Sequence, residues 1–300
     1  MRIALPIQRQ WGERTKTASN QAWVKRMLVI AVVLGVFAVV PAASCGRQES
    51  EGWQKPAPTA QARIFGHVRD FDGKPIEGAV IELKTVRFEN AAETRSAADG
   101  SYSMSVETGM YIALIAVKDY SLKYLEYWAW NVPAFGELEI NPRFDRLEVY
   151  ALNAWRPQGG YPSYQLYFRP MSLTMAAAAA TSAGGMDKLG TLPFLDIAPD
   201  LLAKDITVKV NDESVEVLLV NKVKEASSPT QALYGYLIQT TLPKAPAVGD
   251  WITIDVTLTD PAVGEKGEGR LYLARPHYVQ TFAPGSGDGT VSAVDQKERK

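Results

Sequence analysis

The chain has 300 residues, of which 46% are hydrophobic and 22% charged, and its formal net charge is −1; this is enough apolar material for one large or two ordinary globular domains. The near-neutral charge argues against a nucleic-acid-binding protein, in which basic side chains would cluster. A single cysteine excludes an internal disulfide and a cysteine-based zinc site.

Residues 1–44 have the pattern of an export signal. They carry six basic side chains and one acidic side chain, and residues 28–40 form an uninterrupted apolar run, LVIAVVLGVFAVV. A run of this length fits the core of a signal peptide, which needs about 7–15 apolar residues, better than a membrane-spanning helix, which needs roughly 20. Translation could start at Met1 or Met27, and the upstream start is favoured because the later one would discard two basic residues.

The sequence Ala42-Ala43-Ser44-Cys45 follows the apolar run. It resembles the lipobox of bacterial lipoproteins, in which small residues precede a cysteine that is lipidated and becomes the mature N-terminus. Ala43 and Ser44 match this pattern, whereas Ala42 stands where Leu, Val or Ile is usual. The resemblance implies that residues 1–44 are cleaved and that Cys45 carries a diacylglyceryl group and further acyl chains such as palmitate, which anchor the chain to the membrane.

Two alternatives to lipidation stay open. An ordinary secretory signal would leave Cys45 as a free thiol, and an uncleaved segment would act as an anchor helix. All three interpretations place the body of the chain outside the cytoplasm. Residues 45–61 are polar and contain Pro56 and Pro58, which is typical of an extended tether.

Short strand-like segments begin at residue 62 and recur about every ten residues. Asp-Gly turns such as Asp72-Gly73 and Asp99-Gly100 separate them, and this spacing predicts a β-sandwich. The segments are ARIFGHVRD (62–70), GAVIELKTV (78–86), SYSMSVE (101–107) and MYIALIAV (110–117).

Four blocks of this stretch match a known family pattern. They are Gly66-x-Val68, the segment 72–79 (DGKPIEGA), the segment 98–102 (ADGSY) and Gly109-x-Tyr111. In this order they resemble the carboxypeptidase regulatory-like family, a small transthyretin-like β-sandwich, over roughly residues 62–150. The resemblance implies a fold and an extracytoplasmic accessory role, and it implies no chemistry. We place this first domain, with an aromatic-rich extension, at residues 62–170.

The first domain offers little to a metal ion. The metallopeptidases that such modules accompany need an HxxE pair and a distant histidine, and this chain has His67 and His277 alone, with Asp70 three residues after the first. Asp70, Asp72 and Glu77 could bind calcium, but a turn in which aspartates bond their own backbone is favoured. We therefore predict no metal site and no cofactor.

Residues 120–168 are rich in tyrosine and tryptophan. Flat rings can stack on sugars, so a carbohydrate-binding site is one interpretation, with Trp128, Trp130, Tyr161 and Tyr164 as its candidate residues. The favoured interpretation is that these rings fill the core and the junction between domains, because the segments that carry them alternate apolar and polar residues.

Residues 171–197 contain the low-complexity run MAAAAATSAGG and predict an Ala/Gly-rich flexible linker. Alternating segments resume over residues 198–282 and predict a second sandwich of immunoglobulin-like type. The motif Gly264-x-x-Gly267-x-Gly269 lies between strands and indicates a hairpin rather than a phosphate-binding loop. Residues 283–300 read as a disordered tail.

The sequence thus predicts an all-β protein with two β-sandwich domains after a cleaved signal peptide. We expect a non-enzymatic lipoprotein of the bacterial envelope that contacts the membrane through lipid on Cys45 and binds an envelope protein or polysaccharide, and no nucleic acid. A carbohydrate-binding module is the alternative, and a hydrolase would need an acidic pair in a cleft.

Overall fold

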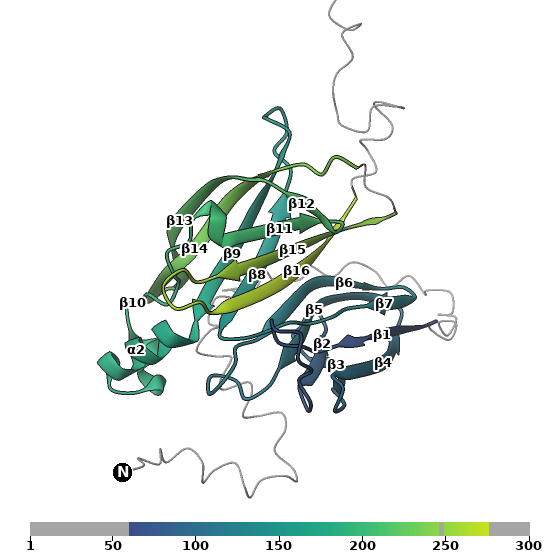
Figure 1. Ribbon diagram of the computed structural model, residues 1–300, viewed down its shortest axis with the longest axis horizontal. Coiled ribbons are helices and arrows are strands. Elements are labelled where there is room, and N and C mark those ends of the chain that lie inside the picture. The colour runs from purple at the N-terminus through teal and green to yellow at the C-terminus, as the bar shows by residue number, and fades with distance from the viewer. Residues whose placement is uncertain (1–59, 246–248, 276–300) are drawn as a thin grey trace, which may run out of the picture.

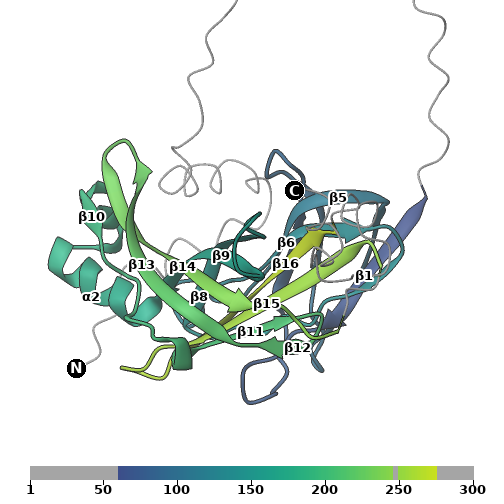
Figure 2. The ribbon, with the colours of Figure 1, turned by 90° about the horizontal axis from the view of Figure 1, so that it is seen from above.

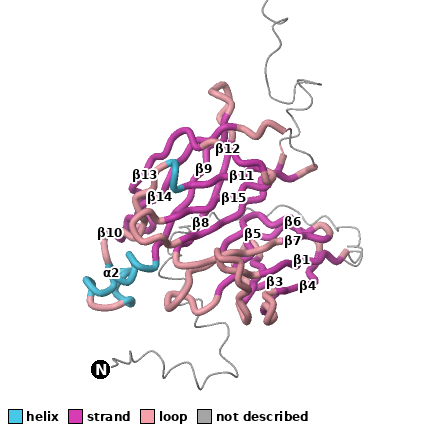
Figure 3. Tube along the Cα trace, viewed as in Figure 1, coloured by secondary structure: helices cyan, strands magenta, loops and turns pink. Residues whose placement is uncertain are grey.

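The computed structural model describes residues 60–245 and 249–275, most of which lie in strands (Figures 1 and 3). The predicted all-β class is confirmed. The predicted signal peptide, the tether apart from residues 60 and 61, Cys45 and the tail at 283–300 lie outside the described residues. None of the described helices has the length and apolar character needed to cross a bilayer.

The first lobe is a β-sandwich. A three-stranded sheet in the order β4-β1-β7 packs on the strands β3, β2, β5 and β6 of a larger sheet. Ile64 and Met104 from the small sheet meet Ile81, Leu114 and Tyr127 from the large one in a closed core, as the period-2 alternation requires. The strands are β1 (Gln61–His67), β2 (Val80–Lys84), β3 (Asn90–Arg95), β4 (Ser101–Glu107), β5 (Gly109–Val117), β6 (Tyr127–Ala134) and β7 (Glu137–Glu139).

The second lobe is also a sandwich. A five-stranded sheet, in the order β10-β14-β9-β8 with β13 paired to β14, packs on β11, β15 and β16 of the larger sheet. The elements are β8 (Leu147–Trp155), β9 (Ser163–Ser172), α2 (Leu173–Ala183), β10 (Phe194–Leu195), β11 (Ile206–Val210), β12 (Glu213–Val215), β13 (Val217–Ser228), β14 (Gln231–Thr241), β15 (Trp251–Thr259) and β16 (Lys266–Ala274), with 3-10 turns at Met186–Thr191 and Ala203–Asp205.

One continuous sheet joins the two lobes. Its eight strands run in the order β12-β11-β15-β16-β6-β5-β2-β3, and β16 lies parallel to β6, with Gly269 opposite Trp128 and Leu271 opposite Trp130. In the first lobe, the core covers the face of β6 that carries Tyr127. In the second lobe, the core covers the face of β16 that carries Leu271, which is the opposite face of the shared sheet. In each lobe, the face of the shared sheet that its own core does not cover therefore lies beside the neighbouring lobe (Figure 1).

Two glycines allow β8 to cross closely over β16. A Cβ at Gly267 would lie 2.2 Å from the carbonyl oxygen of Leu147, and a Cβ at Gly269 would lie 2.9 Å from the Cβ of Val149. The motif predicted as a hairpin therefore lies partly inside a strand: only Gly264, at φ +76°, is in the turn before β16. Glycine is needed at 267 and 269 for close backbone approach.

The segment predicted as a flexible linker contains the helix α2. Ser172 caps it, since its Oγ accepts a hydrogen bond from the N–H of Met175 at 3.2 Å, and Gly184 ends it in the left-handed conformation. The change of core also falls earlier than the predicted boundary at residue 170, because Phe144 belongs to the first core and Leu147 to the second. Strands β8 and β9 thus pack in the second lobe.

Candidate functional site

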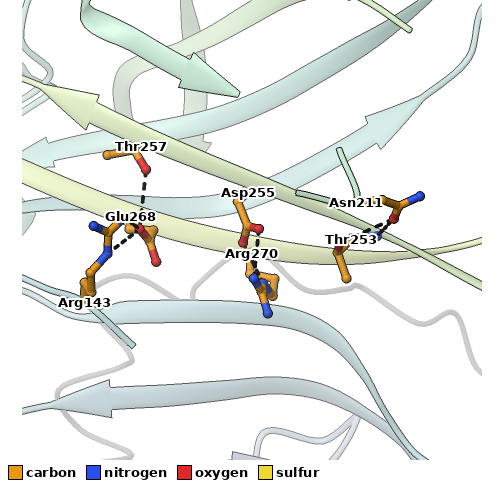
Figure 4. A network of polar contacts seen from close by, with 7 residues as sticks. All are labelled: Arg143, Asn211, Thr253, Asp255, Thr257, Glu268 and Arg270. Carbon is orange, nitrogen blue, oxygen red and sulfur yellow. Dashed lines mark hydrogen bonds and ion pairs between the residues drawn. The ribbon is translucent and has the colours of Figure 1, made fainter. Parts of the chain in front are cut away.

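Charged and hydroxyl side chains cover the face of β11, β15 and β16 that is turned toward the first lobe (Figure 4). The apolar side chains of these strands point the other way, into the second core. Strand pairing aligns the polar side chains in two cross-strand rows. The rows are Lys209–Asp255–Arg270 and Thr207–Thr257–Glu268.

Two arginine–carboxylate pairs hold this network together. Arg270 donates from Nε to Asp255 Oδ1 at 2.6 Å and from Nη2 to Asp255 Oδ2 at 2.8 Å. Arg143, which follows β7 in the first lobe, donates from Nε to Glu268 Oε2 at 2.9 Å and also pairs through Nη2. Burial raises the pKa of Glu268, and the Arg143 guanidinium opposes that rise. The Arg143–Glu268 pair therefore joins the lobes electrostatically.

A cavity of about 140 Å³ lies beside the network and is also lined by Lys209 and Asp212. Small-molecule sites usually have roughly 300–1,000 Å³, and a water takes about 30 Å³, so this space has room for no more than a few waters. Since the carboxylates of Asp255 and Glu268 are already paired with guanidinium groups, the arrangement fits a clamp between lobes better than a catalytic centre.

A second cavity of about 300 Å³ lies between the start of α2 and the turn that joins β15 to β16. Met175, Pro199, Pro261 and Val263 contribute apolar lining. Asp200, at its rim, is paired with Lys222 at 2.6 Å. Thr174 and Asp260 also line it, and their side chains are bonded to Glu265 and to the N–H of Ala262. This hollow can therefore hold an apolar side chain.

A closed aromatic cluster lies on the opposite side of the shared sheet from the polar network. The rings of Trp128 and Trp130 stack with centroids 4.9 Å apart, and Tyr150 from β8 meets them edge-on at 5.1 and 5.6 Å. Ala113 and Ile115 pack beneath them. Each such ring contact adds about 0.5–1.5 kcal/mol beyond area burial, so the cluster seals the junction between β6 and β8.

Two buried carboxyls lie beneath this cluster. Glu148 accepts a hydrogen bond from Trp128 Nε1 at 3.0 Å and one from the backbone N–H of Glu126 at 3.4 Å. Burial, followed by the nearby Glu82 carboxyl, raises the pKa of Glu126 to about 7, and burial with the Glu126 charge raises that of Glu148. The two groups therefore carry fewer than two charges at neutral pH. Neither lines a cavity described above.

The four residues predicted for sugar binding are placed apart. Trp128 is 2% exposed in the aromatic cluster and Tyr164 is 3% exposed in the second core, whereas Tyr161 is 65% exposed between β8 and β9. Trp130 is half-buried beside Trp128. Strand alternation turns Tyr164 inward and the indole stack closes Trp128, so these four rings do not form one exposed sugar-binding surface.

The acidic turn of the first lobe bonds its own backbone. Asp70 Oδ1 accepts hydrogen bonds from the N–H groups of Asp72 at 3.0 Å and Lys74 at 2.8 Å, as the turn interpretation predicts. Within residues 60–245 and 249–275, no three His, Cys, Asp or Glu side chains are grouped so as to hold a metal ion.

Sequence reasoning did not identify the buried ionic groups. Glu148 and Glu268 lie inside the strand-like segments LEVYALNAW and KGEGRLYLA, and an acidic residue within such a segment was the available signal. Arg143 lies 125 residues before its partner Glu268. Pattern alone does not bring such distant positions together.

The sequence matches no protein-family model and none of the curated proteins. Among solved structures, BcpA, the major pilin subunit of Bacillus cereus, aligns over 72% of this chain and 69% of its own, with 10% identity and a TM-score of 0.24.

Two further solved structures give similar values. A DUF3823 family protein from Parabacteroides merdae aligns over 71% of this chain and 100% of its own, with 10% identity and a TM-score of 0.22. The major pilin SpaD from Corynebacterium diphtheriae aligns over 71% and 64%, with 9% identity and a TM-score of 0.21. TM-scores this low do not define a shared fold.

Proposed function

We propose that this protein is a lipoprotein of the bacterial envelope that acts outside the cytoplasm as a non-enzymatic binding or structural module. The support for the anchor lies in the sequence: the apolar run 28–40 is followed by Ala43-Ser44-Cys45. Residues 45–61, fully extended at about 3.3 Å per residue, would reach roughly 50 Å from the membrane. The described lobes would then be held near the bilayer without being inserted into it.

The observation that carries the proposal is the sheet shared by both lobes. Because β16 and β6 are paired and the Arg143–Glu268 pair lies beside the junction, the lobes form one body rather than two domains joined by a flexible linker. Such a body can present a surface to a partner at a fixed orientation. The expected partner is an envelope protein or polysaccharide.

Replacement of the lipidated residue tests the anchor. We expect wild-type protein, expressed in a bacterial host fed radiolabelled palmitate, to carry label and to sediment with membranes. The variant Cys45→Ser should carry none, because serine offers no thiol for the diacylglyceryl group. Ser44→Ala is the matched control, since it keeps a small residue at the cleavage position, and it should be labelled like wild type.

Fractionation separates the alternatives. Unlabelled wild-type protein in an extracytoplasmic soluble fraction would support an ordinary secretory signal, and unlabelled, unshortened protein in membranes would support an anchor helix. Wild-type protein found unlabelled in the cytosol would overturn both the anchor and the location.

A further inference from the structure

The five-stranded sheet has an outer face that points away from the second core. Its strands β8, β9, β14 and β13 lie side by side (Figure 2). Cross-strand register places aromatic rings, amides and the leucines Leu219 and Leu237 on this outer face. Cross-strand register puts Trp155 opposite Gln165 and Gln165 opposite Gln239, and in the next row Asn153 opposite Tyr167. We call this set the amide–aromatic face, and it consists of Asn153, Trp155, Gln165, Tyr167, Asn221 and Gln239.

The two rings of this face have different supports. Trp155, at the end of β8, is 46% exposed. The ring of Tyr167 lies over β14 at Gly235, where a Cβ would come within 2.9 Å of the ring atom Cε2. Its hydroxyl bonds the Glu225 carboxylate, which fixes the ring against the sheet. Tyr167 is half-buried, and a ring held in place offers its exposed apolar surface to a ligand at little entropic cost.

The amides beside these rings keep hydrogen-bonding capacity. Gln239 donates from Nε2 to Ser163 Oγ at 2.9 Å, which leaves its carbonyl oxygen as an acceptor. Asn153 donates to the carbonyl of Ala151 at 3.1 Å, and its side-chain oxygen likewise remains. Gln165, in the middle of the first row between Trp155 and Gln239, supplies a further donor and acceptor. The face thus combines flat apolar surfaces with amide dipoles.

The charges on this face cancel within it. Arg169 pairs with Glu225 from β13 and donates from Nε to the Tyr167 hydroxyl at 2.9 Å. A polyanion would need unpaired cations, and the guanidinium here is already paired. A ligand that complements the face is therefore polar and uncharged, with apolar C–H patches that can lie on rings.

These properties match a sugar chain without acidic groups. We propose that the amide–aromatic face binds an uncharged polysaccharide, with the rings of Trp155 and Tyr167 stacked on pyranose faces and the amides of Gln165 and Gln239 bonded to hydroxyls. This inference rests on the proposed function of an envelope-binding module and names its ligand class. It replaces the predicted residues Trp128, Trp130, Tyr161 and Tyr164 with a different set.

Affinity electrophoresis of the full chain in detergent micelles tests the proposal. The gels contain laminarin, dextran or xyloglucan as uncharged probes, and polygalacturonate as an acidic one. We expect at least one uncharged probe to retard the protein. Trp155→Ala should weaken that retention at least fivefold, whereas Trp155→Tyr should largely preserve it because a flat ring remains. Tyr167→Ala should also weaken retention, because the second ring is lost.

Phe135→Ala is the matched control, since this ring is 57% exposed on the first lobe; it should bind like wild type. The proposal is overturned if none of the three uncharged probes retards the protein, if Trp155→Ala binds as well as wild type, or if polygalacturonate binds more tightly than all of them. The binding assay does not depend on lipid. If no probe binds but Cys45 carries label, the proposed polysaccharide site is wrong and the proposed lipid anchor is still supported. If an unlipidated chain binds a probe, the proposed polysaccharide site is supported although the lipid anchor is not.

Discussion

Glu126 and Glu148 hold carboxyl groups in an environment that disfavours charge. Both are buried between β6 and β8, and the raised pKa of each comes first from that burial. A folded-state pKa above the usual value means that the folded protein binds more protons than the unfolded chain. Its stability therefore falls as the pH rises, from the usual carboxyl value of 4.5 through about 7 for Glu126.

Replacing Glu126 with glutamine should remove much of this dependence, because glutamine resembles the protonated acid. We expect Glu126→Gln to be more stable than wild type at pH 8, by on the order of 2 kcal/mol, and about equal to it near pH 4. Urea midpoints across this range give the comparison. Glu107→Gln, on the exposed edge of β4, is the control and should track wild type. A variant with the wild-type pH profile would show that Glu126 is ionised at neutral pH.

At the scale of elements, the crossing of β8 over β16 depends on missing side chains. Gly267 lies under the backbone of Leu147, and Gly269 lies under Val149. Neither glycine has a positive φ. Glycine is therefore required at these positions by the lack of space for a side chain and not by the backbone conformation. A side chain there must push two strands apart, and both strands belong to the second core.

Gly267→Ala should destabilise the protein by about 2–3 kcal/mol, because its Cβ would overlap backbone atoms that cannot rotate away. The control is Gly136→Ala, where nothing lies within 4 Å of the added carbon, and it should be neutral or slightly stabilising. Chemical denaturation of both variants measures the difference. Equal stability of the two would mean that the strands separate at low cost.

The same scale explains why α2 was not predicted as a helix. Its alanines favour helix, but the flanking Thr, Ser and Gly resemble a flexible segment. What stabilises the helix is the Ser172 cap together with the burial of Leu173 and Ala180. That burial depends on neighbours supplied by the fold.

At the scale of the whole molecule, the shared sheet couples the two lobes. The parallel pairing of β6 with β16 cannot break without exposing apolar side chains such as Trp130 and Leu271. We therefore expect the described lobes to unfold in one cooperative transition. Calorimetry would contradict this if the first and second lobes melted separately.

The ion pair between the lobes should contribute to that cooperativity. Arg143→Met leaves the 9%-exposed Glu268 without its partner from the first lobe and should cost about 1–2 kcal/mol. Arg63→Met is the matched control, because its pair with Glu137 has both side chains at least half exposed and such pairs contribute about 0–1 kcal/mol. Thermal melts of both variants test this. Equal losses of stability in the two variants would mean that the Arg143–Glu268 pair does not help to hold the lobes together.

The sequence by itself determined the local features of this protein. Alternation in segments such as ARIFGHVRD and SYSMSVE predicted strands, and Asp-Gly turns placed their ends, because side-chain direction and turn chemistry depend on near neighbours. It also carried the predictions for Cys45 and the export signal, which lie outside the described residues. These signals need no knowledge of the fold.

The tertiary structure alone decided how the strands combine. Strand alternation favoured buried positions for the rings of residues 120–168 but did not say what covers each one. The structure closes Trp128 with Trp130 and Tyr150 and places Tyr164 in the second core. Arg143 meets Glu268 and Tyr167 lies over Gly235 only because sheet order brings residues from distant parts of the chain together. Pairing between distant strands depends on the packing of the whole molecule, and no short stretch of sequence records it.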